Sequence, residues 1–210
     1  MCTELLQNQS ENIVFLAHLN SFKPSEIEGE IVEVSSKELE QLSLLKTPNL
    51  VLAIVKKPSK RISQASTTKL TLALDGVQDP GNLGTILRIA DWFGIETIIC
   101  SKETVDCFNP KVVQASMGAV FRVHCFYTDL SMYLKNVKVP IYGADLNGDN
   151  LFELKALQPG VIVMGNEGNG LSTEVRECIQ QKLMIPKFGN AESLNVAVAT
   201  GIIVSAFFNK

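Results

Sequence analysis

The chain has 210 residues and a mass of 23.0 kDa, which suits one large domain or one domain with a small addition. It is 46% hydrophobic and 20% charged, a balance that excludes a disordered or low-complexity protein. Its formal net charge of −3 excludes a protein that coats nucleic acid through bulk charge. A polyanionic partner therefore has to be met by a local basic patch.

Cysteine and histidine give no pattern of a metal site. The five cysteines include no Cys-x-x-Cys pair, and His18 and His124 are the two histidines. We therefore expect neither a bound metal nor a disulfide framework. Scattered thiols are typical of a reducing compartment, and we expect no signal peptide, because the first residues lack a charged segment followed by an apolar one. The longest apolar stretch, 194–208, is shorter than the roughly 20 residues that cross a bilayer. We expect a cytoplasmic protein that does not enter the membrane.

Charge divides the chain into three parts. Residues 1–55 carry eight Glu against three Lys, whereas residues 56–69 carry five Lys or Arg and no acid. The second segment also holds Pro58 and a Ser/Thr/Gln run, a composition typical of a linker. Its charge has two readings that stay open, a solvated linker and a strap that contacts phosphate groups. The predicted organisation is a small domain at 1–57, a basic linker at 58–69 and a larger domain at 70–210.

The small domain has the pattern of an α/β unit. Its strand-like runs are residues 12–17, 29–35 and 51–57. Ser35 or Ser36 is placed to cap a helix over 36–45. The chain opens inside a helix-like segment, TELLQN, and so few elements make a thin core. We expect this domain to be incomplete.

From residue 70 onward, apolar strands alternate with helices. The strand-like runs are residues 70–77, 96–101, 121–126, 139–145, 160–166 and 182–187. The helix-like stretches are residues 83–93, 109–119, 129–137, 172–181 and 193–208. This alternation predicts an α/β fold with a mostly parallel sheet and helices on both faces. The last stretch is apolar almost all round, which predicts a helix buried on every side by the core and a second subunit.

Three loops at the ends of strands carry candidate functional residues, because open α/β sheets bind ligands there. The first loop, 75–94, contains Asn82, Gly84 and Arg88. Asp79, Pro80 and Gly81 form a turn, and Gly84 allows a close approach of the backbone. The structural reading makes Asn82 a helix N-cap and Arg88 a surface cation.

The second loop, 164–172, has the glycine density of a ligand cradle. Its order is G-x-x-G-x-G after the fifth strand of the domain, whereas the dinucleotide fingerprint is G-x-G-x-x-G after the first strand. Glu167 would also repel a pyrophosphate. These features disfavour a nucleotide-dependent oxidoreductase, and the structural reading of Glu167 is an acid that matches a helix dipole.

The third loop lies within 185–201 and leads into the apolar final helix. Ser193 or a neighbour is placed to cap that helix. Asn195 sits among apolar residues, so we expect its amide to have buried hydrogen-bond partners.

Together the three loops resemble the three motifs of the SpoU/TrmH family within the SPOUT methyltransferases. The first motif, N-x-G-x-x-x-R, is present as Asn82, Gly84 and Arg88. The second, G-x-E-G-x-G, spans Gly165 to Gly170. The third is Ile185-Pro186 followed by Ser193-Leu194-Asn195-Val196. Order, spacing and strand context agree over residues 70–210.

The resemblance implies a C-terminal deep trefoil knot, a homodimer, and methyl transfer from S-adenosylmethionine to a ribose 2′-hydroxyl of rRNA or tRNA. This reaction requires no metal, because the cofactor carries the reactive group. The residues matching the family's reacting centre are Asn82, Arg88, Glu167, Ser193 and Asn195. Those expected at the cofactor are Gly165, Asn166, Gly168, Gly170, Ile185 and Leu194. The small domain resembles the family's ribosomal-protein-like RNA-binding domain without its opening helix and strand.

The chemistry sets the roles of these residues. A ribose hydroxyl is a poor nucleophile, so the site has to align it with the methyl group and help its proton leave. A guanidinium stays protonated, so Arg88 suits a clamp on the adjacent phosphate and a stabiliser of alkoxide charge. Ser193 and Asn195 would orient the ribose. The alternative is a non-catalytic RNA-binding relative that keeps the fold.

Overall fold

The computed structural model describes residues 2–8, 10–45, 47–57, 68–154 and 157–208. The chain divides into two compact units, Met1–Lys60 and Arg61–Lys210. Most of the predicted linker at 58–69 lies outside the described residues.

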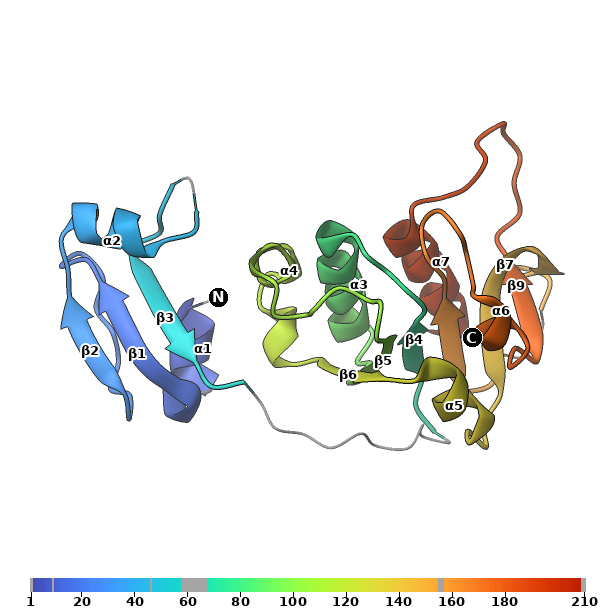
Figure 1. Cartoon of the computed structure of the whole chain (residues 1–210), viewed down its shortest axis with the longest axis horizontal. Helices are drawn as coiled ribbons and strands as arrows, with labels where there is room; N and C mark the ends of the chain where they lie inside the picture. The colour runs from blue at the N-terminus through green and yellow to red at the C-terminus, as the bar shows by residue number, and fades with distance from the viewer. Residues whose placement is uncertain (1, 9, 46, 58–67, 155–156, 209–210) are drawn as a thin grey trace. The chain divides into compact units, whose positions relative to one another are not determined.

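The smaller unit is a three-stranded sheet with two helices (Figure 1). The strand order is β2 (Glu30–Glu33), β1 (Ile13–His18) and β3 (Val51–Val55), with β1 parallel to β2 and antiparallel to β3. Helices α1 (Cys2–Asn8) and α2 (Ser36–Leu42) contact β3. The predicted cap is confirmed at Ser35, which forms a capping box with Glu38 at the start of α2.

The larger unit is built on a six-stranded sheet. The strand order is β6 (His124–Thr128), β5 (Thr97–Ser101), β4 (Thr71–Leu74), β8 (Val161–Met164), β7 (Ile141–Asn150) and β9 (Gln181–Met184). Each neighbouring pair of strands is parallel, which confirms the predicted sheet. Every residue of β4 and β8 is buried, as in strands that are covered on both faces.

Helices cover both faces of this sheet, as predicted. Helices α3 (Pro80–Trp92), α4 (Pro110–Ser116) and α7 (Val196–Phe208) share a core with Leu72 and Leu74 of β4. Helices α5 (Leu130–Lys135) and α6 (Thr173–Arg176) share the other core with Ala73 of the same strand. The alternation along β4 follows from the two-residue repeat of a strand.

Some element boundaries differ from the prediction. The helix expected over 172–181 covers only α6, because the Gln180 N–H donates to the Ile141 carbonyl at 3.0 Å and brings the chain to the sheet. Strand β7 continues past residue 145, because polar residues up to Asn150 pair with β9 after an irregularity that begins at Ala144. The strand expected at 121–126 begins at His124, after the short 3-10 helix Ala119–Phe121.

Helix α7 is buried on one face only within this chain. Thr200, Ile203 and Val204 are buried, whereas Val198 and Phe208 are 53% and 51% exposed. The core of the single chain therefore covers only part of the helix, and the predicted cover of the rest by a second subunit stays a prediction. The predicted trefoil knot stays a prediction. None of the helices among the described residues is long and apolar enough to cross a membrane.

Gly84 serves helix packing. A Cβ atom at this position would collide with the Cβ of Ala115 and lie 3.0 Å from the Ser116 nitrogen, both on α4. The close approach expected at Gly84 is therefore the contact between α3 and α4.

We expect Gly84→Ala to destabilise the protein, because an added methyl group in this contact forces the two helices apart. Overpacking of this kind costs about 1–3 kcal/mol in unfolding free energy, which urea denaturation would measure. The matched control is Gly201→Ala on α7, where a Cβ would lie 3.5 Å from Ile89 Cδ1. Alanine is favoured over glycine inside a helix by about 1 kcal/mol, so this variant should be at least as stable as the wild type. Equal stability of Gly84→Ala and the wild type would contradict the packing role.

Candidate active site

The carboxylate of Glu167 connects the loop after β8 to the loop after β4. It accepts a hydrogen bond from Asn82 Nδ2 at 2.9 Å. It also accepts from the main-chain N–H groups of Asp79 and Gln78 at 3.4 and 3.5 Å. Because β4 and β8 are neighbours in the sheet, these two loops leave the same edge side by side.

Asn195 extends this network to the third loop. Its Nδ2 donates to Asn82 Oδ1 at 2.8 Å, and its Oδ1 accepts from the N–H groups of Ala197 and Val198 at 2.9 and 3.3 Å. Asn195 thus caps α7, so the expected cap is a neighbour of Ser193 rather than Ser193 itself. The Asn195 side chain is exposed, and of its expected buried partners only Ala197 is buried, since Asn82 is half-buried and Val198 is exposed.

The start of α3 also differs from the prediction. The N-cap is Asp79, whose Oδ1 accepts from the Asn82 N–H at 2.8 Å, and Pro80 occupies the first helical position. Asn82 is therefore not the cap, and its side chain is free to bridge Glu167 and Asn195. The Asp-Pro pair was the signal for this helix start.

Asn166 shapes the glycine-rich loop. Its Nδ2 donates to the Gly76 carbonyl at 2.7 Å, and its Oδ1 accepts from the N–H groups of Gly168 and Asn169 at 2.9 and 3.0 Å. Asn166 and Gly170 also exchange two main-chain hydrogen bonds. These bonds close the loop into a tight turn.

Two glycines are required by this turn. A Cβ at Gly165 would lie 2.6 Å from the Gly170 oxygen and from the Leu171 nitrogen. Gly170 has φ +69°, a left-handed conformation that glycine adopts at little cost. The glycine density predicted for this loop is thus needed first for its own geometry.

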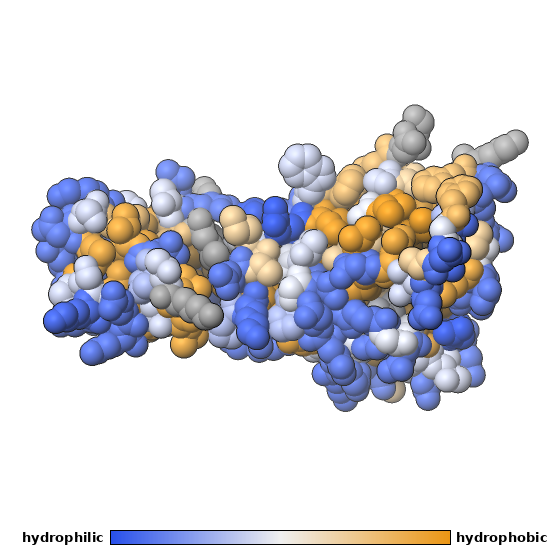
Figure 2. Space-filling model, turned by 90° about the horizontal axis from the view of Figure 1, so that it is seen from above, coloured by the Kyte–Doolittle hydropathy of each residue, from blue (hydrophilic) through white to orange (hydrophobic). Residues whose placement is uncertain are grey.

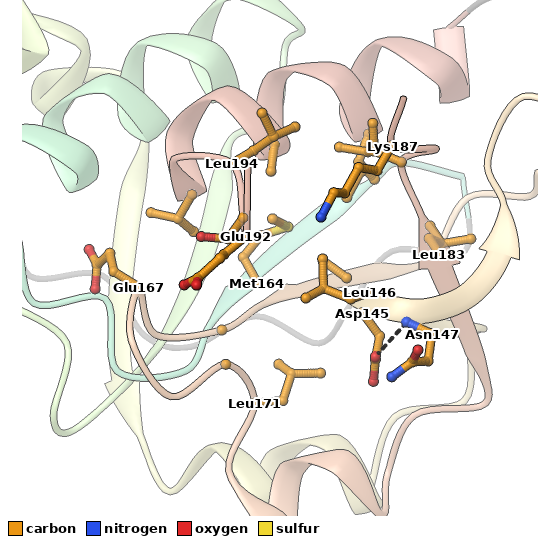
Figure 3. A pocket seen from close by; sticks show the side chains of 18 of the residues that line it. Asp145, Leu146, Asn147, Met164, Glu167, Leu171, Leu183, Lys187, Glu192 and Leu194 are labelled. Carbon is orange, nitrogen blue, oxygen red and sulfur yellow. Dashed lines mark hydrogen bonds between the residues drawn. The ribbon is translucent and has the colours of Figure 1, made fainter. Parts of the chain in front are cut away.

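A cavity of about 700 Å³ lies beside this turn, a volume within the usual range of small-molecule sites. All six residues expected to contact the cofactor line it, and so do Glu167 and Ser193. Asn82 and Asn195 do not line the cavity, but the hydrogen-bonded network joins them to Glu167. Figure 3 shows Glu167 on one side of the cavity and Asp145 on another.

Arg88 is the predicted site residue that belongs neither to the cavity wall nor to the network of Glu167. It is exposed on α3 and is absent from the cavity walls. Within the described part of the chain it forms no hydrogen bond or ion pair, so its guanidinium is available to a partner from outside.

A charged cluster on the cavity wall was not predicted. Asp145 pairs with Lys182 at 3.2 Å and with Arg176 at 3.5 Å, and it accepts from the Asn147 N–H at 2.9 Å. Burial alone would raise the pKa of Asp145, but the Asn147 N–H and the two cations outweigh burial and hold this pKa below its usual range. Asp145 ends the strand-like run predicted over 139–145 and lies within β7, so the rule that open α/β sheets bind ligands at strand ends could have singled it out.

Asp75 was also missed. It is buried and accepts from the Ser172 N–H at 2.6 Å, so it ties the end of the glycine-rich loop to the end of β4. It directly follows the buried strand β4. Among the residues that the structure describes, no group of three or more His, Cys, Asp or Glu could hold a metal ion.

The fold and these loops define a methyltransferase-like α/β domain of the SpoU type. The model of the SpoU rRNA Methylase family matches residues 69–205, and the chain belongs to this family. The predicted family is thereby confirmed.

Two relatives show how far the similarity extends. The chain is 33% identical over 187 residues to the 23S rRNA (guanosine(2553)-2′-O)-methyltransferase RlmP of Bacillus subtilis, covering 86% of this chain and 74% of that protein. It is 35% identical over 149 residues to the 23S rRNA (guanosine-2′-O-)-methyltransferase RlmB of Neisseria meningitidis serogroup B, covering 69% of this chain and 60% of that protein.

Solved structures agree with the predicted fold class. A TrmH-family protein from Porphyromonas gingivalis is 38% identical, with a TM-score of 0.84 over 97% of this chain and 84% of that chain. An S-adenosylmethionine-bound rRNA methyltransferase from Sinorhizobium meliloti is 29% identical, with a TM-score of 0.83 over 93% of this chain and 79% of that chain.

Proposed function

We propose that this protein transfers a methyl group from S-adenosylmethionine to a ribose 2′-hydroxyl of ribosomal RNA. The observation that carries the proposal is the Glu167–Asn82–Asn195 network, which joins all three motif loops beside one cavity. Membership of the SpoU family supports it, as do the names of the relatives, which act on 23S rRNA. The intact motif residues beside this cavity argue against a non-catalytic relative that only keeps the fold.

The cavity suits S-adenosylmethionine. Met164, Leu183 and Leu194 provide apolar walls. The carboxylate of Glu192 extends into the cavity, whereas that of Glu167 points from the cavity wall toward the β4–α3 loop (Figure 3). Carboxylates complement the positive sulfur, and the apolar walls complement the adenine ring. When bound, the cofactor supplies an electrophilic methyl group. The residues that would hold it are Gly165, Asn166, Gly168, Gly170, Ile185 and Leu194.

The chain's own residues would hold the ribose in position. Glu167 is fixed by donors from the β4–α3 loop, so its carboxylate presents a constant geometry to the hydroxyl. Ser193 lines the same cavity and offers a hydroxyl to the ribose. Asn82 and Asn195 act by fixing Glu167. Arg88 would clamp the neighbouring phosphate and stabilise the alkoxide as its proton leaves.

The cytoplasmic location of the protein stays a prediction.

The smaller unit is proposed to assist in RNA binding. The eight Glu and three Lys of residues 1–55 disfavour strong attraction to phosphate groups. The larger unit therefore has to provide most of the contacts at the reacting nucleotide.

We also propose a homodimer formed through α7. Hydrophobic side chains gather on one face of the larger unit (Figure 2). Val198 and Phe208 of α7 are about half exposed, and Trp92 of α3 is 85% exposed. Trp92 precedes Phe93, whose ring packs against Phe208 with the centroids 5.1 Å apart, so the C-terminal ends of α3 and α7 lie side by side. Exposed apolar patches of this kind mark interfaces.

Val198→Asp should turn the dimer into a monomer, because it places a charge in the apolar contact. Val198 lies in the first turn of α7, where an acid suits the helix dipole, so the helix itself should persist. Sedimentation velocity at micromolar concentration would measure the change. The control is Met132→Asp on α5, which is 63% exposed in the wild type and should leave the dimer intact. A monomeric wild type would refute the homodimer.

Gly165→Ala should weaken S-adenosylmethionine binding at least about tenfold. The added Cβ collides with the backbone of Gly170, so the turn that lines the cavity has to open; a tenfold loss corresponds to about 1.4 kcal/mol. Titration calorimetry would measure the affinity, and Gly201→Ala is the control for a glycine with room for a methyl group. Unchanged binding by Gly165→Ala would place the cofactor elsewhere.

Arg88→Ala should bind S-adenosylmethionine normally and lose methyl transfer. Removing a charge-assisted contact made in the transition state lowers the rate by about 10²–10³-fold. Arg88→Lys should recover little, because an ammonium cannot reproduce the planar fork of a guanidinium.

Mapping 2′-O-methyl groups on total RNA with and without the gene would first identify the substrate. Single-turnover kinetics on that RNA would then compare the two Arg88 variants with the wild type. If the alanine variant turned over at a near-normal rate, Arg88 would be a surface cation, and Glu167 and Ser193 would be left as the candidates.

A further inference from the structure

Phe188 is a nearly free aromatic ring at the edge of the cavity. It is 96% exposed, the highest value among the exposed large hydrophobic side chains that the structure describes. It is also the one aromatic residue among the described residues that line the cavity. A single exposed apolar residue is ordinary on a protein surface, so exposure alone does not indicate a function for Phe188, whereas its position at the cavity does.

The loop that carries Phe188 is held at both ends. Before it, the Met184 carbonyl accepts from the Leu151 N–H at 2.9 Å, and Ile185 packs against the core. After it, Asn195 caps α7 and binds Asn82. The ring is therefore presented from a loop with fixed ends that also contributes Ser193 and Leu194 to the cavity.

Lys187 adds a charge next to this ring. Its amine extends over the cavity (Figure 3), and within the described residues it forms no ion pair. Phe188, by contrast, makes almost no contact with the rest of the chain. A cation and an exposed ring in adjacent positions match the two parts of a nucleotide, its phosphate and its base.

The substrate chemistry favours a base as the partner of this ring. RNA is recognised mainly through unpaired bases that stack on aromatic side chains. A chain with a net charge of −3 needs such uncharged contacts near its active site, because bulk attraction to phosphate is weak. An incoming ribose also has to pass the rim of the cavity to reach Glu167 and Ser193.

We propose that Phe188 is a positioning residue that stacks on an unpaired RNA base next to the ribose to be methylated. The inference rests on the proposed function. The group that contacts Phe188 is an RNA base, not the adenine of the cofactor or a second copy of the chain, and the test separates these three.

The test compares Phe188→Ala, Phe188→Leu and Phe188→Trp with the wild type on unmodified 23S rRNA made by transcription. We expect kcat/KM for RNA to fall at least about tenfold in the Ala and Leu variants, because both lack a ring for stacking. The Trp variant should keep wild-type values. The affinity for S-adenosylmethionine should stay within about twofold in every variant, because the ring stacks on the RNA base and does not contact the cofactor.

Three results would overturn the inference. Wild-type behaviour of Phe188→Leu would mean an apolar contact without stacking. Weaker cofactor binding in the Ala variant would mean that the ring closes on the cofactor. A change of sedimentation coefficient would mean a contact between two copies of the chain.

Binding measured without methyl transfer keeps this inference separate from the proposed function. Fluorescence anisotropy of the labelled transcript, with S-adenosylhomocysteine present, should show the same order of affinities. If the wild type binds the RNA but transfers no methyl group, the proposed function fails while the stacking is still tested. If the wild type is active and the Ala variant matches it in both assays, the stacking role alone fails.

Discussion

The carboxylate of Glu167 is the interaction on which the arrangement of the site depends. It accepts from a side-chain amide and two main-chain N–H groups of a loop about 85 residues earlier in the chain. Hydrogen bonds to an ionised acceptor are about twice as strong as neutral ones. Glutamine would keep one acceptor oxygen without the charge, whereas an apolar residue of similar size would remove the acceptor that sets the orientation of Asn82. The network from Glu167 through Asn82 to Asn195 would then break at its first bond.

The strand order explains how these distant residues meet. Strands β4 and β8 are neighbours, so the loops that follow them leave the sheet together. Helix α7 then packs beside α3, where Gly201 faces Ile89, and its N-terminal cap comes within 2.8 Å of Asn82. Residues separated by 113 positions are thus brought together by sheet topology and one helix contact.

Much of this could be predicted from the sequence because it depends on local patterns. The apolar runs predicted each strand of the parallel sheet, and the capping signal predicted the start of α2. The extension of β7 through polar residues could not be predicted, since pairing with β9 overrides their preference for a turn. The cluster at Asp145 was missed because its partners, Arg176 and Lys182, come from other elements. Likewise, nothing local showed that Gly84 packs against α4 rather than a ligand.

The hydrogen bonds also divide the motif residues into two groups. Asn82, Asn166 and Asn195 use both ends of their amides to hold loops and a helix in place. They are therefore already engaged before any substrate arrives, and their motif positions follow from what they hold together.

The residues that remain available for a substrate lie at the rim and on the surface. Within the described residues, Ser193, Lys187 and Arg88 form no hydrogen bond or ion pair, and Phe188 is almost fully exposed. A site divided in this way has a rigid base and an open rim. Its reacting geometry is completed only when RNA engages the rim. The site therefore favours RNA over a free nucleoside, because a nucleoside lacks the phosphate and the neighbouring base that the side chains at the rim and on the surface would bind.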